Sequence, residues 1–283
     1  GGPLESLCDD GLGVVSLIGC VRVRFAHGLA LDGPNAISRG SVTKRTIVAF
    51  DGQKGGAEGL LITSDGATVR DFSMQNARGN GIKSKGVKQI SMINLVVEWT
   101  HGPSASNGSY GVYPVSSSNV LIDRVVVRGA SDAGIYVGQS QNIVVQNSRA
   151  EFNVAGIEIE NSFHADIHDN ISTHNAGGIL VFDLPGLPQM GGHSTRVFHN
   201  EVVNNDTQNF APKGNTVAGV PTGTAIMVMA NRDVHVFDNH IDGNASSGVM
   251  LVAYLNAFTD PSYNPLPRDI TFHGNHFGHN GVA

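Results

Sequence analysis

The stretch GIEIENSFHADIHDNISTHNAGGILVFD, residues 156–183, decides the fold because it contains the same short pattern twice. GIEI begins at residue 156, and GILV begins 22 residues later, at 178. Six related tetrads recur on both sides: GLLI (59–62), GIKS (81–84), GVYP (111–114), GIYV (134–137), AIMV (225–228) and GVML (248–251). In chain order, the intervals between the first residues of all eight tetrads are 22, 30, 23, 22, 22, 47 and 23. The chain therefore repeats a unit of about 22 residues, and two of the units carry insertions.

Asparagine marks the same unit a second time. Four pairs of asparagines are spaced five residues apart: Asn170 and Asn175, Asn200 and Asn205, Asn239 and Asn244, and Asn275 and Asn280. Asparagine tolerates a left-handed backbone and hydrogen-bonds within tight turns, which suits it to a corner between two strands. In stacked units, the equivalent asparagine side chains are expected to form an amide ladder.

A unit of this length, with short apolar alternation and no helical periodicity, cannot bury its apolar face alone. Stacked copies bury it when each strand pairs with the equivalent strand of the next unit. The repeat thus predicts an all-β fold, a right-handed single-stranded parallel β-helix of roughly nine or ten coils. We expect one domain, 1–283, with strand-rich first coils in 1–58 and loop insertions at 98–110 and 183–224.

Composition narrows the class of protein. The net charge is −6 and no lysine- or arginine-rich block is present, which argues against a general nucleic-acid binder. No apolar run approaches the length needed to span a membrane. The two cysteines, Cys8 and Cys20, are compatible with one disulfide or with two free thiols.

The Gly-Ile-x-Val and Asn-x4-Asn units of residues 59–280 resemble those of the right-handed parallel β-helix repeat proteins, the pectate-lyase-like superfamily. GASDAGIYVGQS, NVAGIEIENS and GGILVFDLP are similar, more closely, to a family of exported bacterial parallel-β-helix domain proteins. Many members of the superfamily cleave or epimerise uronate polysaccharides on the outer face of one sheet. The resemblance therefore implies a secreted or periplasmic protein that acts on acidic glycans. Related lyases use calcium, so a calcium site is an alternative to a site without a cofactor.

More specific motifs of such enzymes are missing. Mannuronan C5-epimerases of this fold carry Asp-Pro-His-Asp after Tyr-Gly-Ile, and the matching stretch YGVYPVSS (110–117) keeps only the proline, Pro114. The Asn-Thr-Asp and Gly-His-Gly blocks of polygalacturonase-like hydrolases are absent. An enzyme on this scaffold needs a different catalytic set.

Counting from the leading glycine of each unit identifies the side chains that are expected on the outer face of one sheet. Positions +1 and +3, such as Ile157 and Ile159, are almost all apolar and are expected to point into the core, which leaves +2 and +4 outside. In four consecutive coils the outer positions are largely polar, and in the later coils they are apolar, as if covered by the second insertion. We predict a cleft with Lys83, Lys85, Tyr113, Tyr136, Glu158 and Glu160 on its floor, next to a covered region of Leu180, Phe182 and Met227.

Each of these side chains suits a step of uronate chemistry. A cation offsets the charge of the substrate carboxylate while a second group moves the C5 proton. We assign the cation to Lys83, with Lys85 as its alternative, and proton transfer to Tyr136, Tyr113 or His101. Substrate contacts are expected from the following: Lys85, Glu158, Glu160, Asp132, Trp99 and Asp183.

For three of these residues a structural role is an equal or better interpretation. Asp132 and Asp183 stand where a side chain caps a turn, and Trp99 can fasten its loop to the core. No metal site is expected from the twelve histidines, because His164, His168 and His174 fall on different faces of one coil.

Three functions follow as hypotheses. The first is an enzyme that acts on an acidic polysaccharide by β-elimination or C5 epimerisation. The second is a non-catalytic glycan-binding or scaffold module that works with another exported protein. The third is a glycoside hydrolase that uses Glu158 and Glu160, whose positions on one strand face lie roughly 6.5–7 Å apart at the backbone, within the range of inverting enzymes.

Overall fold

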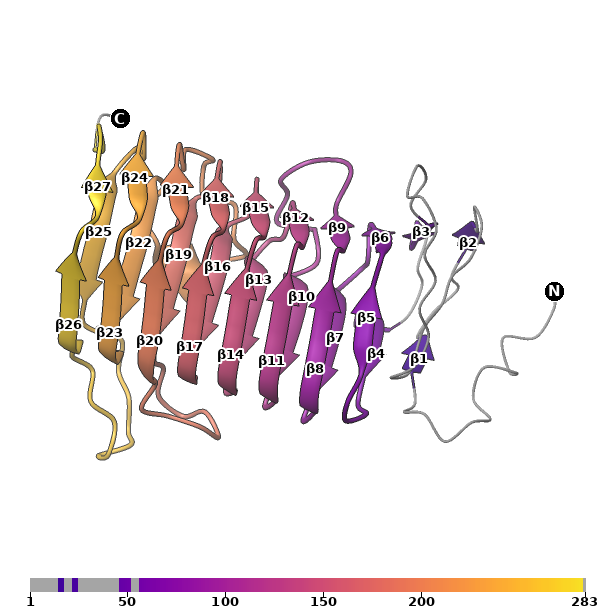
Figure 1. Ribbon diagram of the computed structural model, residues 1–283, viewed down its shortest axis with the longest axis horizontal. Coiled ribbons are helices and arrows are strands. Elements are labelled where there is room, and N and C mark those ends of the chain that lie inside the picture. The colour runs from indigo at the N-terminus through magenta and orange to yellow at the C-terminus, as the bar shows by residue number, and fades with distance from the viewer. Residues whose placement is uncertain (1–14, 18–21, 25–45, 52–55, 282–283) are drawn as a thin grey trace.

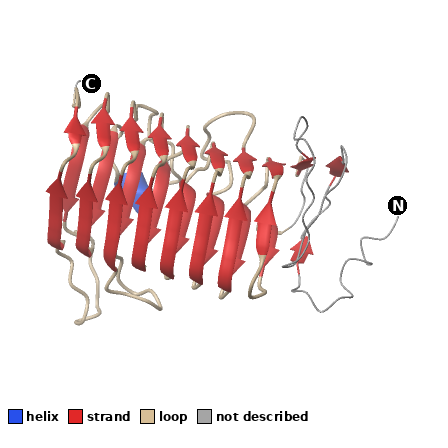
Figure 2. Cartoon of the chain, in the orientation of Figure 1, coloured by secondary structure: helices blue, strands red, loops and turns tan. Residues whose placement is uncertain are grey.

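A computed structural model describes residues 15–17, 22–24, 46–51 and 56–281, and these form a rod of stacked β-coils (Figure 1). Cys8 and Cys20 lie outside the described residues. Three sheets run along the rod, and nearly all of the regular structure is strand (Figure 2). The all-β prediction is confirmed. The first sheet contains nine strands: β1 (Val15–Leu17), β4 (Glu58–Ile62), β7 (Asn80–Lys85), β10 (Tyr110–Val115), β13 (Ala133–Gly138), β16 (Ala155–Glu160), β19 (Gly177–Phe182), β22 (Thr224–Met229) and β25 (Ser247–Val252).

The other two sheets complete each coil. The second sheet has eight strands: β5 (Thr68–Arg70), β8 (Lys88–Ile93), β11 (Ser118–Asp123), β14 (Gln141–Gln146), β17 (Phe163–His168), β20 (His193–Phe198), β23 (Arg232–Phe237) and β26 (Arg268–His273). The third sheet has ten: β2 (Arg22–Arg24), β3 (Thr46–Ala49), β6 (Phe72–Gln75), β9 (Val96–Glu98), β12 (Val126–Arg128), β15 (Arg149–Glu151), β18 (Ile171–Thr173), β21 (Glu201–Val203), β24 (His240–Asp242) and β27 (His276–Phe277).

From β4 to β27 the chain makes eight coils, each with one strand in every sheet, and all neighbouring coils pair in parallel. The predicted nine or ten coils included first coils in residues 1–58, most of which lie outside the described residues. The described strands near the N-terminus depart from the regular pattern. β1 pairs antiparallel with β4, and β2 pairs antiparallel with β3, whereas β3 pairs in parallel with β6.

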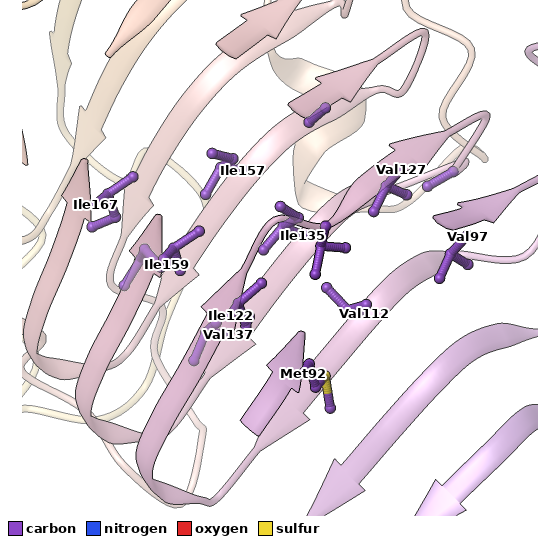
Figure 3. Packing of buried hydrophobic residues seen from close by; sticks show 14 of the residues in the cluster. Met92, Val97, Val112, Ile122, Val127, Ile135, Val137, Ile157, Ile159 and Ile167 are labelled. Carbon is purple, nitrogen blue, oxygen red and sulfur yellow. The ribbon is translucent and has the colours of Figure 1, made fainter. Parts of the chain in front are cut away.

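The core lies inside the rod, where apolar side chains of the three sheets meet (Figure 3). Ile135, Val137, Ile157 and Ile159, which occupy positions +1 and +3 of two neighbouring units, are completely buried. The prediction that these positions point inward is confirmed. Equivalent residues of neighbouring coils stack on one another. Ile135 pairs in register with Ile157, and Ile157 pairs with Ile179.

Two amide ladders run along the rod, as the asparagine spacing predicted. One side chain donates to the next from Asn170 through Asn200 and Asn239 to Asn275, at 2.9–3.0 Å. The second ladder runs through Asn153, Asn175, Asn205, Asn244 and Asn280, at 2.8–3.1 Å.

The left-handed backbone, however, belongs to the residue before the ladder asparagine at every position except Asn280. Asp169, His174, His199 and Asn204 have φ between 52° and 54°, while the asparagines that follow them do not. The asparagines are therefore required for their side-chain hydrogen bonds, and their neighbours form the turn.

The insertions leave the coils at two different corners. The predicted 98–110 insertion lies between β9 and β10. The predicted 183–224 insertion is split by β20 and β21 into a loop at 183–192 and a loop at 204–223, which contains the 3₁₀ helix η2 (Thr216–Gly219). A further loop at 253–267, between β25 and β26, went unrecognised in the sequence because it follows the last tetrad. Within the described residues, no helix has the length and apolar character to cross a membrane.

Candidate functional site

The outer face of the first sheet is covered over four consecutive coils. All six residues of β13, β16, β19 and β22 are buried, so both faces of these strands lie inside the protein. The strands on either side, β10 and β25, are only partly buried. The covered part forms a second apolar core outside the rod.

The loop at 204–223 supplies much of this cover. Val217 and Val220 are buried in the second core together with Leu180, Phe182 and Met227. The prediction that the second insertion folds over these three residues is confirmed. The C-terminal loop adds the buried ring of Tyr263.

The cover reaches further than the sequence indicated. It extends over β13 and β16, so Tyr136 and Glu158 are only 4% and 1% exposed. We expected both side chains, with Glu160, on the floor of an open cleft. They lie instead beneath the second core, because the covering loops span two more coils than the apolar columns suggested.

Three carboxyl groups interact electrostatically in this covered region. Asp132 precedes β13, and Glu158 and Glu160 lie on β16. Asn215 donates from its side-chain nitrogen to Asp132 at 2.7 Å, and the Tyr136 hydroxyl donates to Glu160 at 2.6 Å. The Glu158 Oε2 atom is buried without a hydrogen-bond partner among the described residues. None of the ion pairs between described residues involves these three carboxyls.

Three tyrosine rings pack beside the carboxyls. The ring centroids of Tyr110 and Tyr113 are 4.5 Å apart, those of Tyr110 and Tyr136 are 4.4 Å apart, and those of Tyr113 and Tyr136 are 5.0 Å apart. Tyr110 was missed because it stands directly before the leading glycine of its unit, a column that the +2 and +4 count does not include. We call Asp132, Glu158, Glu160 and the three tyrosines the acid–tyrosine cluster.

Burial without a neighbouring cation raises the pKa of every carboxyl in the cluster. The pKa of Asp132 rises to about 6, mainly through burial, although hydrogen bonds from Asn215 and Tyr110 oppose the rise. Burial raises the pKa of Glu160 to about 7, against the hydrogen bond from Tyr136. The pKa of Glu158 is raised well above its usual range by burial and by the charges of Asp132 and Glu160.

These shifts make the folded protein less stable as the pH rises. Each carboxyl binds its proton more tightly in the folded state. Its ionisation therefore leaves the free energy of unfolding unchanged below the unfolded pKa and lowers it as the pH rises through the folded pKa. For Asp132 that window runs from 3.8 to about 6, and for Glu160 from 4.5 to about 7. We expect Glu158→Gln, which stays neutral, to become more stable than the wild type as the pH rises above 4.5, the ordinary pKa of a glutamate.

The measurement is urea unfolding of both proteins across this pH range. The advantage of Glu158→Gln should vanish below about pH 4, where the wild-type carboxyls are protonated in both states. Glu201→Gln, on the exposed surface of β21, serves as the matched control and should follow the wild type. An equal stability of Glu158→Gln and wild type at every pH would mean that Glu158 is not buried without a partner.

The remaining predicted residues are spread around the cluster. Lys83 forms an ion pair with Glu58 at 3.1 Å and lies 4.7 Å from the centre of the Tyr113 ring. Lys85, two residues along β7, is exposed, and so is His101 in the loop after β9. The structure therefore brings Lys83 to the tyrosines and leaves Lys85 and His101 exposed.

Two other predicted contacts have structural roles. Trp99 is buried, and its indole nitrogen donates to the carbonyl oxygen of Ala77 at 2.7 Å, so it fastens the 98–110 insertion to the core. Asp183 accepts hydrogen bonds from the backbone N–H groups of Gly191 and Gly192, which ties together the two ends of the 183–192 loop. These contacts support the structural roles that the sequence left open for Trp99 and Asp183.

The family model of a right-handed β-helix region matches residues 58–217, which is more than half of the chain. The chain belongs to the right-handed β-helix family. The handedness that was predicted from the crossover rule is thereby confirmed. No curated protein matches it in sequence.

Solved structures with the same fold resemble this β-helix protein at low identity. A periplasmic alginate epimerase, crystallised as a double mutant, is 13% identical with a TM-score of 0.55, and the match covers 74% of this chain and 50% of the epimerase. The A-module of an Azotobacter vinelandii mannuronan C-5 epimerase is 14% identical with a TM-score of 0.40, covering 77% and 63%. The catalytic domain of an α-1,3-glucanase in complex with nigerose is 12% identical with a TM-score of 0.35, covering 79% and 54%. This β-helix protein thus spans about half the length of the first of these structures.

Metal-binding groups do not gather in the described part of the β-helix. There, no three His, Cys, Asp or Glu side chains are placed to hold a metal ion. His168 and His174 contact Asp169 and Asp206 at separate corners. Calcium stays a prediction of the family resemblance.

The acid–tyrosine cluster can hold and move protons. At neutral pH, Asp132, with a pKa of about 6, is largely ionised and able to accept a proton, and burial raises the pKa of the neighbouring Glu158. Burial also raises the pKa of Tyr110 and Tyr136, so both remain neutral phenols that donate hydrogen bonds. Groups whose pKa values are pushed apart in one region are the usual components of an acid–base site.

Proposed function

We propose that the protein acts outside the cytoplasm on a uronate-containing glycan, by C5 epimerisation or β-elimination, at the end of the acid–tyrosine cluster that faces β10 and β7. The observation that carries the proposal is the Asp132–Tyr110 pair. It joins a carboxyl whose pKa is about 6 to a neutral phenol, at the boundary where the fully buried coils give way to a partly exposed strand.

The residues on this side suit a negatively charged sugar. Tyr113 is partly exposed, and its aromatic ring offers a flat surface to a pyranose. Lys83, which is paired with Glu58, lies over that ring, and the exposed Lys85 lies two residues further along the same strand, so positive charge stands beside the surface that would bind the substrate carboxylate. The likeness to a periplasmic alginate epimerase supports the same class of substrate and location.

In the proposed reaction, the ionised Asp132 carboxylate removes the proton from C5 of a uronate unit. The electron pair left at C5 is delocalised into the substrate carboxylate, whose added charge Lys83 and Lys85 stabilise. For epimerisation, a tyrosine phenol returns a proton to the opposite face of C5. For β-elimination, the electron pair forms the C4–C5 double bond, the bond from C4 to the glycosidic oxygen breaks, and that oxygen takes a proton.

This assignment moves proton transfer away from Tyr136. The Tyr136 hydroxyl is buried and already donates to Glu160, so its role is to hold the carboxyl beneath the substrate surface. A hydrolase that uses Glu158 and Glu160 has less support, because Glu158 is only 1% exposed and the sequence blocks of polygalacturonase-like hydrolases are absent.

The test is incubation with alginate, pectate and other polyuronates in D₂O. Removal and return of the C5 proton is expected to place deuterium at C5, seen by NMR of the recovered polymer, and elimination is expected to raise the ultraviolet absorbance of unsaturated uronates. A neutral glucan serves as the control substrate. Binding without deuterium or unsaturation would contradict the proposal and favour a glycan-binding module of an exported complex. New reducing ends without either signal would favour hydrolysis.

A further inference from the structure

A second site lies at another corner of the rod, between two of its loops. The loops at 183–192 and 253–267 connect the first sheet to the second, and both extend past the same end of the strands, at the lower left in Figure 1. Between them is a pocket of about 430 Å³. This volume is within the range of natural small-molecule sites. The acid–tyrosine cluster is reached from the opposite corner, where Asp132 follows the third sheet.

Two arginines without ion-pair partners among the described residues lie at this corner, and one of them, Arg268, lines the pocket. Arg232 and Arg268 are register partners on the adjacent strands β23 and β26, and both are exposed. None of the ion pairs between described residues involves either guanidinium. Like charges directly opposite each other on neighbouring strands destabilise a sheet, and a bound anion would remove that repulsion.

The charges around the pair do not neutralise it. The carboxylate of Asp183 feels both arginines, which lower its pKa against the effect of burial, but it also accepts the N–H groups of Gly191 and Gly192. His193, the register neighbour of Arg232, has its pKa lowered by burial and by that arginine, which favours its neutral form. Among the described residues, neither Asp183 nor Asp233, which contacts His235, forms an ion pair with the two guanidinium groups.

The pocket walls suit a sugar ring. The residues that line it are Asp183, Met190, Gly191, Ser262, Tyr263, Asn264 and Arg268. The Asn264 side-chain oxygen accepts the backbone N–H of Leu266, which leaves its amide nitrogen as a donor. Tyr263 is held in place because its hydroxyl donates to the Asp183 carbonyl oxygen at 2.6 Å. The pocket thus combines guanidinium and amide donors with an aromatic and thioether wall.

We propose that this pocket binds a uronate unit of an acidic glycan, with the carboxylate on Arg268 and Arg232 and the ring against Tyr263 and Met190. Arginine suits this role because its planar fork matches a carboxylate. The choice of ligand rests on the proposed function, but the site is separate from Asp132. It would hold a glycan chain at a distance from the unit that reacts near Asp132. Binding in this pocket does not require that reaction.

The test measures binding of oligogalacturonate and oligomannuronate by calorimetry, with the recovered ligand checked for integrity. Arg268→Gln and Arg232→Gln are each expected to weaken binding about tenfold or more, because each removes charge-assisted hydrogen bonds. Arg196→Gln is the matched control: Arg196 is also exposed on the second sheet but is already paired with Asp166. It should bind as the wild type does.

A local readout separates this pocket from the catalytic surface. With methyl-labelled methionine, the Met190 signal, assigned through Met190→Leu, is expected to shift on addition of oligouronate and not on addition of the carboxyl-reduced oligosaccharide. Unchanged affinity in Arg268→Gln, or an equal response to the carboxyl-reduced ligand, would overturn the inference. If the proposed reaction fails and this pocket still binds, the oligouronate shifts the Met190 signal of the wild-type protein but gains no deuterium at C5. The two failures can therefore be told apart.

Discussion

Replacing Asn205 with alanine is expected to lower the free energy of unfolding by about 4 kcal/mol. The Asn205 side chain is completely buried and is the middle member of its ladder. Its Oδ1 accepts the backbone and side-chain N–H groups of Asn175, and its Nδ2 donates to Ser172 O at 3.1 Å and to Asn244 Oδ1 at 2.8 Å. Alanine leaves the Asn175 N–H and the Ser172 carbonyl buried without these partners, and water cannot replace them inside the rod.

Thermal melting and urea unfolding of Asn205→Ala measure this effect. Asn256→Ala is the matched control, because Asn256 is exposed in the 253–267 loop. We expect that variant to stay within about 0.5 kcal/mol of the wild type. Equal midpoints for the two variants would show that the ladder contributes nothing beyond the strand pairing.

Asp132→Asn is expected to reduce turnover of the uronate substrate by roughly 10²- to 10⁴-fold, the usual contribution of a general base. The substitution keeps the size of the side chain and removes its ability to accept the C5 proton. Asp166→Asn, a change of the same kind on the second sheet, should leave turnover unchanged. Full turnover in Asp132→Asn, with the fold intact by circular dichroism, would rule out Asp132 as the base.

The pH profile supplies a second readout for Asp132. The base must be ionised, so kcat/KM should rise with pH through the folded pKa of about 6. Asn215 lowers that pKa by donating to the carboxyl, and Asn215→Ala should therefore move the acidic limb to higher pH. An unmoved limb would assign the titration to another group.

Much of the covered site could be anticipated, but not its extent. The apolar residues Leu180, Phe182 and Met227 on an outer face indicated a covering segment, since exposed apolar columns of that size are rare in soluble proteins. Glu158 and Tyr136 gave no such sign, because a polar side chain on an outer strand position is ordinarily solvated. Only the path of the loops shows that both are buried.

The sequence by itself determined the coil, the inward columns and the two ladders. These depend on contacts between equivalent residues of adjacent units, and such contacts recur at a fixed spacing that can be read along the chain. The contact between Asn215 and Asp132 joins residues 83 positions apart, and the pocket joins the loops at 183–192 and 253–267. No repeat encodes such contacts. Tertiary structure decided them, because the path of an inserted loop depends on the apolar surface available where it lands.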